Sequence, residues 1–257
     1  RIGKYHEMEF TPDIFACVLQ YPNAAGNVED YRAFVEKAHA ANCKVAVAAD
    51  ILSLALLTPP GEWGADIVFG TTQRLGTPMF YGGPSAAYFA TRDEYKRNMP
   101  GRIIGWSKDK YGKLCYRMAL QTREQHIKRE KATSNICTAQ ALLATMAGFY
   151  AVYHGPEGIR TIAERIHSIA VFLEESINRL GYKQVNAQYF DTLRFALPDT
   201  ISAQQIRTIA LSKEVNLRYF KNGDVGMSID ETTDITAVNV LLSIFAIAAG
   251  RDWEKAS

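Results

Sequence analysis

The chain has 257 residues, of which 47% are hydrophobic and 22% are charged, a composition typical of globular proteins and not of disordered or fibrous ones. Its formal net charge of +2 is too small to indicate a nucleic acid or a membrane surface as a partner. The most apolar predicted helix, residues 237–250, is shorter than the roughly 20 residues that span a bilayer. We find no signal peptide and no transmembrane pattern in the sequence.

The cysteines are widely spaced and show no metal-binding pattern. A chain of this length does not need disulfides for stability, so we expect reduced thiols and no metal site. We also expect a location in the bacterial cytoplasm or, in a eukaryote, the mitochondrial matrix. The sequence begins at Arg1 without a methionine, and we expect it to be a piece of a longer polypeptide. The cysteines are Cys17, Cys43, Cys115 and Cys137.

The first part of the chain predicts a parallel sheet. Residues 14–21 form an apolar run of strand length, typical of a strand buried on both faces. An amphipathic helix over residues 28–41 and a second buried strand over 45–49 follow. Such a strand-helix-strand unit is parallel and right-handed almost by rule.

Two more strands are predicted, over residues 66–70 and 82–91, and the polar cluster Arg92-Asp93-Glu94 starts a helix after them. We expect these elements to form one sheet with helices on both faces. Residues 100–117 then predict a hairpin with its tip at Lys110–Lys113.

Long helices and a second group of strands make up the remainder. Helices are predicted over residues 137–153 and 156–180, the second ending at Gly181 as a left-handed cap. Asn222-Gly223 is a strong hairpin signal. The other predicted elements are a strand at 192–197, a helix at 203–213, paired strands at 217–220 and 224–229, and a helix at 235–249.

Polar residues follow two of the predicted strands. Asp50 lies at the carboxyl end of the second strand, where open α/β sheets place ligand-facing residues. The stretch Asp66–Pro84 runs from a strand through a small, hydroxyl-rich loop to Gln73-Arg74 and a Gly-Gly-Pro turn. In enzymes of the aspartate aminotransferase fold that use pyridoxal 5'-phosphate (PLP), such a loop carries the Schiff-base lysine. Arginine stays protonated and cannot be that nucleophile.

Three segments resemble the P-protein family of the glycine cleavage system: Asp66–Ser85, Met99–Arg102 and, most specifically, Ala119–Thr145 with its TREQHIKREKATSNICT run. The resemblance extends over essentially the whole chain. It implies an α/β, PLP-dependent transferase fold (aspartate aminotransferase, fold type I), with a partial large domain over residues 1–159 and a small α+β domain over 160–257.

The resemblance also implies a function. In this family two halves each resemble a PLP-enzyme subunit, and this chain resembles the amino-terminal half, in which Gln73-Arg74 stands where the other half has His-Lys. The family uses PLP to decarboxylate glycine and passes the aminomethyl group to the lipoyl arm of H-protein. We therefore expect PLP to be held by the catalytic half and none by this chain. The implied partners are that half, lipoylated H-protein and glycine, in a dimer or heterotetramer.

The candidate site residues are Arg74 and a group of polar residues from 123 to 135. Arg74 either pairs with a phosphate or carboxylate near a shared cleft or forms a structural ion pair, for example with Asp50. The charged stretch is either a contact surface with the catalytic half or a solvated helical face, and its end caps a helix or meets a ligand. These candidates are Arg123, Glu124, His126, Lys131, Thr133, Ser134 and Asn135.

Two alternatives remain open. A complete PLP enzyme would use another lysine, such as Lys96, Lys108 or Lys131, although none follows a strand through a short loop of small residues. Alternatively, the chain is a scaffold that only stabilises its partner half. A nucleic-acid module is disfavoured because the charged stretch has no aromatic residue.

Overall fold

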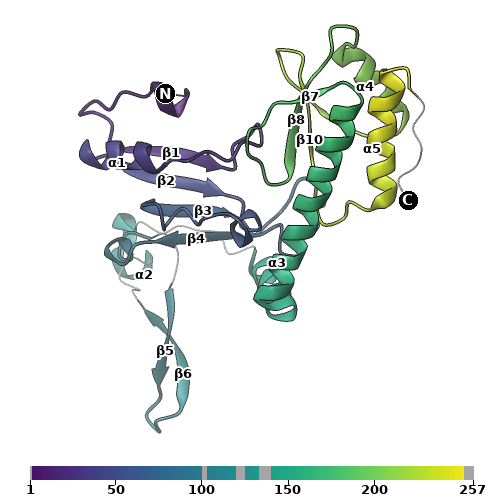
Figure 1. Cartoon of the computed structure of the whole chain (residues 1–257). Coiled ribbons are helices and arrows are strands. Elements are labelled where there is room, and N and C mark those ends of the chain that lie inside the picture. The colour runs from purple at the N-terminus through teal and green to yellow at the C-terminus, as the bar shows by residue number, and fades with distance from the viewer. Residues whose placement is uncertain (1, 100–102, 120–124, 133–139, 252–257) are drawn as a thin grey trace.

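The computed structural model describes residues 2–99, 103–119, 125–132 and 140–251. Its elements form two groups, one around a mainly parallel sheet and one around an antiparallel sheet packed against long helices (Figure 1). Each group has its own hydrophobic core. The first core consists of residues between Cys17 and Val68, and the second consists of Leu52 and residues between Ala163 and Ala248.

The first sheet confirms the predicted strand-helix-strand unit. Strands β1 (Ala16–Tyr21), β2 (Lys44–Ala49) and β3 (Ile67–Thr71) are parallel, and β4 (Ala87–Thr91) is antiparallel to β3, in the order β1-β2-β3-β4. Helix α1 (Arg32–Ala40) covers one face of this sheet with buried apolar side chains. These are Phe34, Val35 and Ala38.

Two predictions about the other face of this sheet were wrong, namely that its first strand is buried on both faces and that helices cover both faces. Strand β1 alternates exposed and buried residues, and Val18 is 67% exposed while its neighbour Leu19 is 9% exposed. The strand is therefore buried on one face only. Within residues 2–99, α1 is the one α-helix and covers one face of the sheet, whereas helices were predicted on both faces. A continuous apolar run fits either pattern, because the sequence does not tell whether a second layer covers the strand.

Two local predictions around β4 were also wrong. The strand begins at Ala87 and not at residue 82, because Gly82 and Gly83 have positive φ and form the preceding turn. After β4 the chain makes only a short 3-10 turn, η3 (Asp93–Tyr95), instead of a helix. Two similar turns, η1 (Tyr5–Glu7) and η2 (Ser53–Ala55), occur earlier.

Helix α3 (Ala141–Arg179) links the two groups. It contains a break at Gly155, whose φ of 63° is not helical, directly before Pro156. Both residues interrupt helices, since glycine adopts positive φ freely and proline lacks an N–H. The two long helices predicted on either side of this point are thus confirmed, except that Gln140 precedes the first helix and residues 137–139 lie outside the described part of the chain.

The second sheet is antiparallel with the order β7-β8-β10-β9, and helices α3, α4 (Ala203–Ser212) and α5 (Ile235–Ala248) pack with it around one core. Side chains of Ser202 and Asp234 accept hydrogen bonds from backbone N–H groups and cap α4 and α5. The strands are β7 (Lys183–Gln184), β8 (Thr192–Ala196), β9 (Arg218–Tyr219) and β10 (Val225–Ser228). Strand β7 was not predicted, because two residues carry no periodic pattern.

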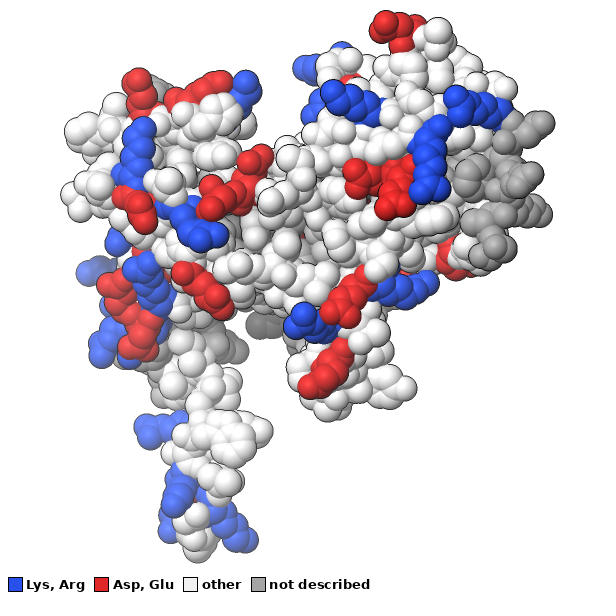
Figure 2. Space-filling model, viewed as in Figure 1, with Lys and Arg blue, Asp and Glu red and all other residues white. Residues whose placement is uncertain are grey.

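A hairpin of β5 (Ile103–Lys108) and β6 (Leu114–Ala119) projects from the body of the molecule, near the short helix α2 (Gln125–Lys128) and the turn η5 (Arg129–Lys131) (Figure 1). Its tip lies at residues 109–113 as predicted. Lysine and arginine side chains gather along its outer part (Figure 2). In the described residues no helix is both long and apolar enough to cross a membrane.

Candidate functional site

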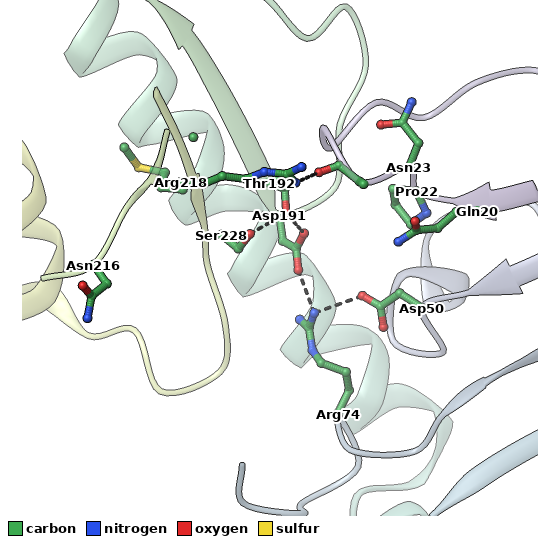
Figure 3. A pocket seen from close by; sticks show the side chains of 13 residues that line it. Gln20, Pro22, Asn23, Asp50, Arg74, Asp191, Thr192, Asn216, Arg218 and Ser228 are labelled. Carbon is green, nitrogen blue, oxygen red and sulfur yellow. Dashed lines mark hydrogen bonds and ion pairs between the residues drawn. The ribbon is translucent and has the colours of Figure 1, made fainter. Parts of the chain in front are cut away.

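A polar cavity of about 580 Å³ lies where the two groups of elements meet (Figure 3). One wall comes from residues that follow strands of the first sheet, and the other from β8, β10 and nearby loops. Such a crevice outside the carboxyl ends of parallel strands is the usual ligand position in open α/β sheets. The lining residues are Gln20, Pro22, Asn23, Ala24, Asp50, Arg74, Asp191, Thr192, Asn216, Arg218, Gly226, Met227 and Ser228.

The guanidinium of Arg74 joins the two walls of this cavity. Its Nη1 donates hydrogen bonds to Oδ2 of Asp50 at 3.0 Å and to Oδ2 of Asp191 at 2.7 Å. Its Nε also lies 3.5 Å from Oε2 of Glu231. Asp50 belongs to the first group of elements, whereas Asp191 and Glu231 belong to the second. One cation therefore pairs with three carboxylates from both sides of the cavity.

Local structure fixes the two ends of this network. Asp50 directly follows β2, and its Oδ1 accepts a hydrogen bond from the N–H of Leu52 at 3.0 Å. Asp191 directly precedes β8, and its backbone oxygen accepts from the N–H of Ile229 at 3.0 Å. The Arg74 guanidinium also lies over the ring of Phe190, 5.8 Å from its centroid.

The charges perturb each other. Burial raises the pKa of Asp50; the nearby Arg74 lowers it, Asp191 and Glu231 raise it, and the net result is a pKa above the ordinary value of an aspartate. For Arg74, burial acts to lower the pKa, but the attraction of the three carboxylates outweighs it and raises the pKa. Arg74 is thus a fixed cation, and the cluster around it carries excess negative charge.

Covalently bound PLP does not fit this cavity. None of its lining residues is a lysine, so the described wall offers no amine for a Schiff base. In addition, the carboxylate of Asp50, at the carboxyl end of β2, already pairs with Arg74. The described residues also contain no group of three or more His, Cys, Asp or Glu that could hold a metal ion.

The cavity contains one of the predicted site residues, Arg74, together with the Asp50 partner suggested for it. Lys131 lies in η5 and is exposed, away from the cavity lining. His126 belongs to α2 by its backbone, and its side chain lies outside the described structure. Residues Arg123, Glu124, Thr133, Ser134 and Asn135 also lie outside it.

Sequence reasoning missed the second wall of the cavity. Asp191 is 117 positions from Arg74, and neither Asp191, Glu231 nor Arg218 belongs to a motif. The only available signal was the position of Asp191 next to a predicted strand. The alternative lysines, Lys96 and Lys108, do not line the cavity either; Lys96 pairs with Asp93 at 2.7 Å.

Solved structures with this architecture define its class. An inhibitor-bound glycine decarboxylase (P-protein) of the glycine cleavage system matches with a TM-score of 0.82 and 32% identity, covering 91% of this chain and 55% of that chain. An alanine–glyoxylate aminotransferase from Nostoc sp. matches with a TM-score of 0.59 and 13% identity, covering 90% and 60%. The fold is thus that of the PLP-dependent fold type I enzymes, as predicted.

Sequence comparison gives the family. Residues 2–245 match the family described as glycine cleavage system P-protein. The glycine dehydrogenase (decarboxylating) of Bacteroides fragilis is 86% identical over 255 residues, covering 99% of this chain, and that of Flavobacterium johnsoniae is 55% identical over 251 residues, covering 98%. This chain therefore belongs to the glycine cleavage system P-protein family. It spans 27% and 26% of the lengths of those relatives.

Proposed function

We propose that this chain is part of a glycine dehydrogenase (decarboxylating), namely the amino-terminal half that lacks the Schiff-base lysine. The whole enzyme would decarboxylate glycine and transfer the aminomethyl group to the lipoyl arm of H-protein. In this proposal Arg74 stands at the lysine position, and the observation that supports it is the pairing of Arg74 with Asp50 and Asp191.

PLP would be held by the catalytic half, where it supplies an electron sink for decarboxylation. The pairing of Arg74 with Asp50 supports this assignment, because the guanidinium satisfies the carboxylate that a pyridinium would otherwise contact. We infer that this half holds no PLP, has no glycine decarboxylase activity by itself, and supplies one wall of the active site. The bacterial cytoplasm or a mitochondrial matrix would be the location.

The proposed wall includes the charged stretch of residues 121–135. The exposure of its described part supports a contact role, since the side chains there are accessible to a partner. The exposed residues include Lys128, Arg129, Glu130 and Lys131. Exposed basic side chains of this kind can form charge-assisted hydrogen bonds with a carboxylate or phosphate of a partner.

A direct test is to change Arg123 or Lys131 to alanine in the full-length enzyme. We expect slower H-protein-dependent release of carbon dioxide from the carboxyl carbon of glycine, with unchanged thermal stability. Lys221→Ala is a matched control, because Lys221 is also an exposed lysine but lies in the turn between β9 and β10.

A scaffold function is the alternative, and the network of Arg74 favours it, since two ion pairs, with Asp191 and Glu231, join the two walls without any ligand. A scaffold predicts the opposite result. Turnover per folded enzyme would be unchanged in the Arg123 and Lys131 variants, and only stability would respond.

A further inference from the structure

The β5–β6 hairpin presents an apolar face that the described residues leave uncovered. In its register Trp106 lies opposite Tyr116, and Ile104 lies opposite Met118. Because side chains alternate between the faces of a strand, these four share one face, together with Leu114 and, opposite it next to the tip, the basic Lys108. Trp106 is 73% exposed and Tyr116 is 75% exposed.

Such a hairpin is unusual as a free structure. A two-stranded hairpin alone is at best marginally stable in water and needs a further layer on its apolar face. The rings of Trp106 and Tyr116 pack edge to face with their centroids 5.7 Å apart, but most of the surface of each residue remains exposed to solvent. The hairpin also projects from the body, so neither sheet of this chain covers it (Figure 1). A contiguous exposed apolar face of this kind marks an interaction site.

The charge of the hairpin indicates what kind of surface covers it. Four basic residues and one acidic residue give residues 103–119 a formal charge of +3, concentrated towards the tip (Figure 2). Two copies of the hairpin packed face to face would bring like charges together, which is unfavourable. An acidic rim around an apolar groove is the complementary surface. The charged residues are Lys108, Asp109, Lys110, Lys113 and Arg117.

We propose that this face docks in an apolar groove with an acidic rim on the catalytic half of the same enzyme. The proposal rests on the proposed function, in which this chain pairs with that half. Most of the length of the closely similar relatives lies outside the region that this chain matches, so a polypeptide of that length contains ample surface to receive the hairpin. The hairpin then acts as an arm that holds the two halves together.

Limited trypsin digestion of the full-length enzyme tests the docking. Exposed loop tips are preferred sites of cleavage, and Lys110 and Lys113 put two trypsin sites at this tip. We expect cleavage there to be about tenfold slower in the wild-type enzyme than in Trp106→Glu/Tyr116→Glu, because cleavage follows the population of the undocked arm. Ser107→Glu, which places a glutamate on the opposite face of the hairpin, is the control and should retain the protection.

Hydrogen exchange of residues 103–119 in the wild-type enzyme gives a second measurement that does not depend on a variant folding. We expect slow exchange in both strands. Rapid exchange with rapid cleavage of the wild-type tip would overturn the proposal and leave the arm free for a membrane or nucleic-acid partner. Protection that disappears on dilution would also overturn it, in favour of a second copy. Neither measurement uses turnover, so a failure of the docking is distinguishable from a failure of the proposed function.

Discussion

Replacement of Arg74 by methionine should strongly destabilise the contact between the two walls of the cavity. The change removes the one cation from a cluster of three carboxylates, while the methionine keeps most of the apolar stem. Arg74 makes hydrogen bonds of 3.0 Å and 2.7 Å to Asp50 and Asp191. In the variant these carboxylates and Glu231 face one another without compensation.

The magnitude follows from the geometry. Two unit charges about 4 Å apart attract by about 4 kcal/mol at an effective dielectric constant of about 20. Desolvation offsets part of this, and removing one partner of a buried ion pair typically costs about 3–5 kcal/mol. The Arg74 side chain is 20% exposed and lines a cavity, so we expect the low end, about 3 kcal/mol.

The loss should depend on pH. Without Arg74 the nearby cation that lowers the folded-state pKa of Asp50 is gone, so this pKa rises further above the unfolded value and the folded state binds a proton more readily. Stability is then retained at low pH and lost as pH rises through the folded-state pKa values. The burial of Asp50 raises its pKa even in the wild type. The deficit of Arg74→Met should therefore be smaller at pH 5 than at pH 8.

Hydrogen exchange of the full-length enzyme is the assay, because it gives the free energy of local opening without requiring two-state unfolding. We expect exchange of the Ile229 amide, which donates to Asp191, to be about a hundredfold faster in Arg74→Met at pH 8. Arg160→Met, which breaks an exposed ion pair with Glu164, is the control and should change stability by less than about 1 kcal/mol. Equal exchange in Arg74→Met and wild type would refute the reasoning, as would a deficit that grows towards pH 5.

Three further predictions concern the rest of the fold. Gly26→Ala should destabilise the contact of the two groups by more than about 1 kcal/mol in urea unfolding, because Gly26 has a φ of 91° and an added Cβ would lie 2.4 Å from the Thr192 carbonyl oxygen; an unchanged midpoint would contradict this. Burial acts to raise the pKa of Asp66, but hydrogen bonds from a backbone N–H and from His39 outweigh it, and the net result is a lowered pKa. Asp66→Asn should therefore lower the free energy of unfolding by about 1–3 kcal/mol at pH 7. This loss should shrink as pH falls below the ordinary aspartate value of 3.8. Phe245→Ala should lower the free energy of unfolding by about 3–5 kcal/mol, since this ring is fully buried; a loss under about 1 kcal/mol in calorimetry would show that the core repacks.

The elements with strong local patterns were predictable. Strand β2, helices α4 and α5, and the hairpin at Asn222-Gly223 begin and end within a few residues of their predicted positions. The break between the long helices also follows from the local chemistry of Gly155 and Pro156. In each case the information lies in a short window of sequence.

Features that depend on distant parts of the chain were not predictable. The exposed face of β1 depends on whether another layer covers it, which an apolar run such as residues 14–21 does not encode. The contact of Arg74 with Asp50 could be predicted, because Asp50 directly follows a predicted strand just upstream. The contacts with Asp191 and Glu231 could not, because these residues reach Arg74 only through the packing of the second group of elements.

Borohydride reduction of the PLP-loaded full-length enzyme tests the central claim most directly. Reduction converts a Schiff base into a stable adduct, and peptide mass spectrometry then locates the modified lysine. We predict a pyridoxyl adduct on a lysine outside residues 1–257 and none on any lysine within them, because in the proposed assignment Arg74, bound to Asp50 and Asp191, takes the place of the nucleophile. A pyridoxyl-lysine anywhere in residues 1–257 would contradict the assignment of this chain as the half without cofactor.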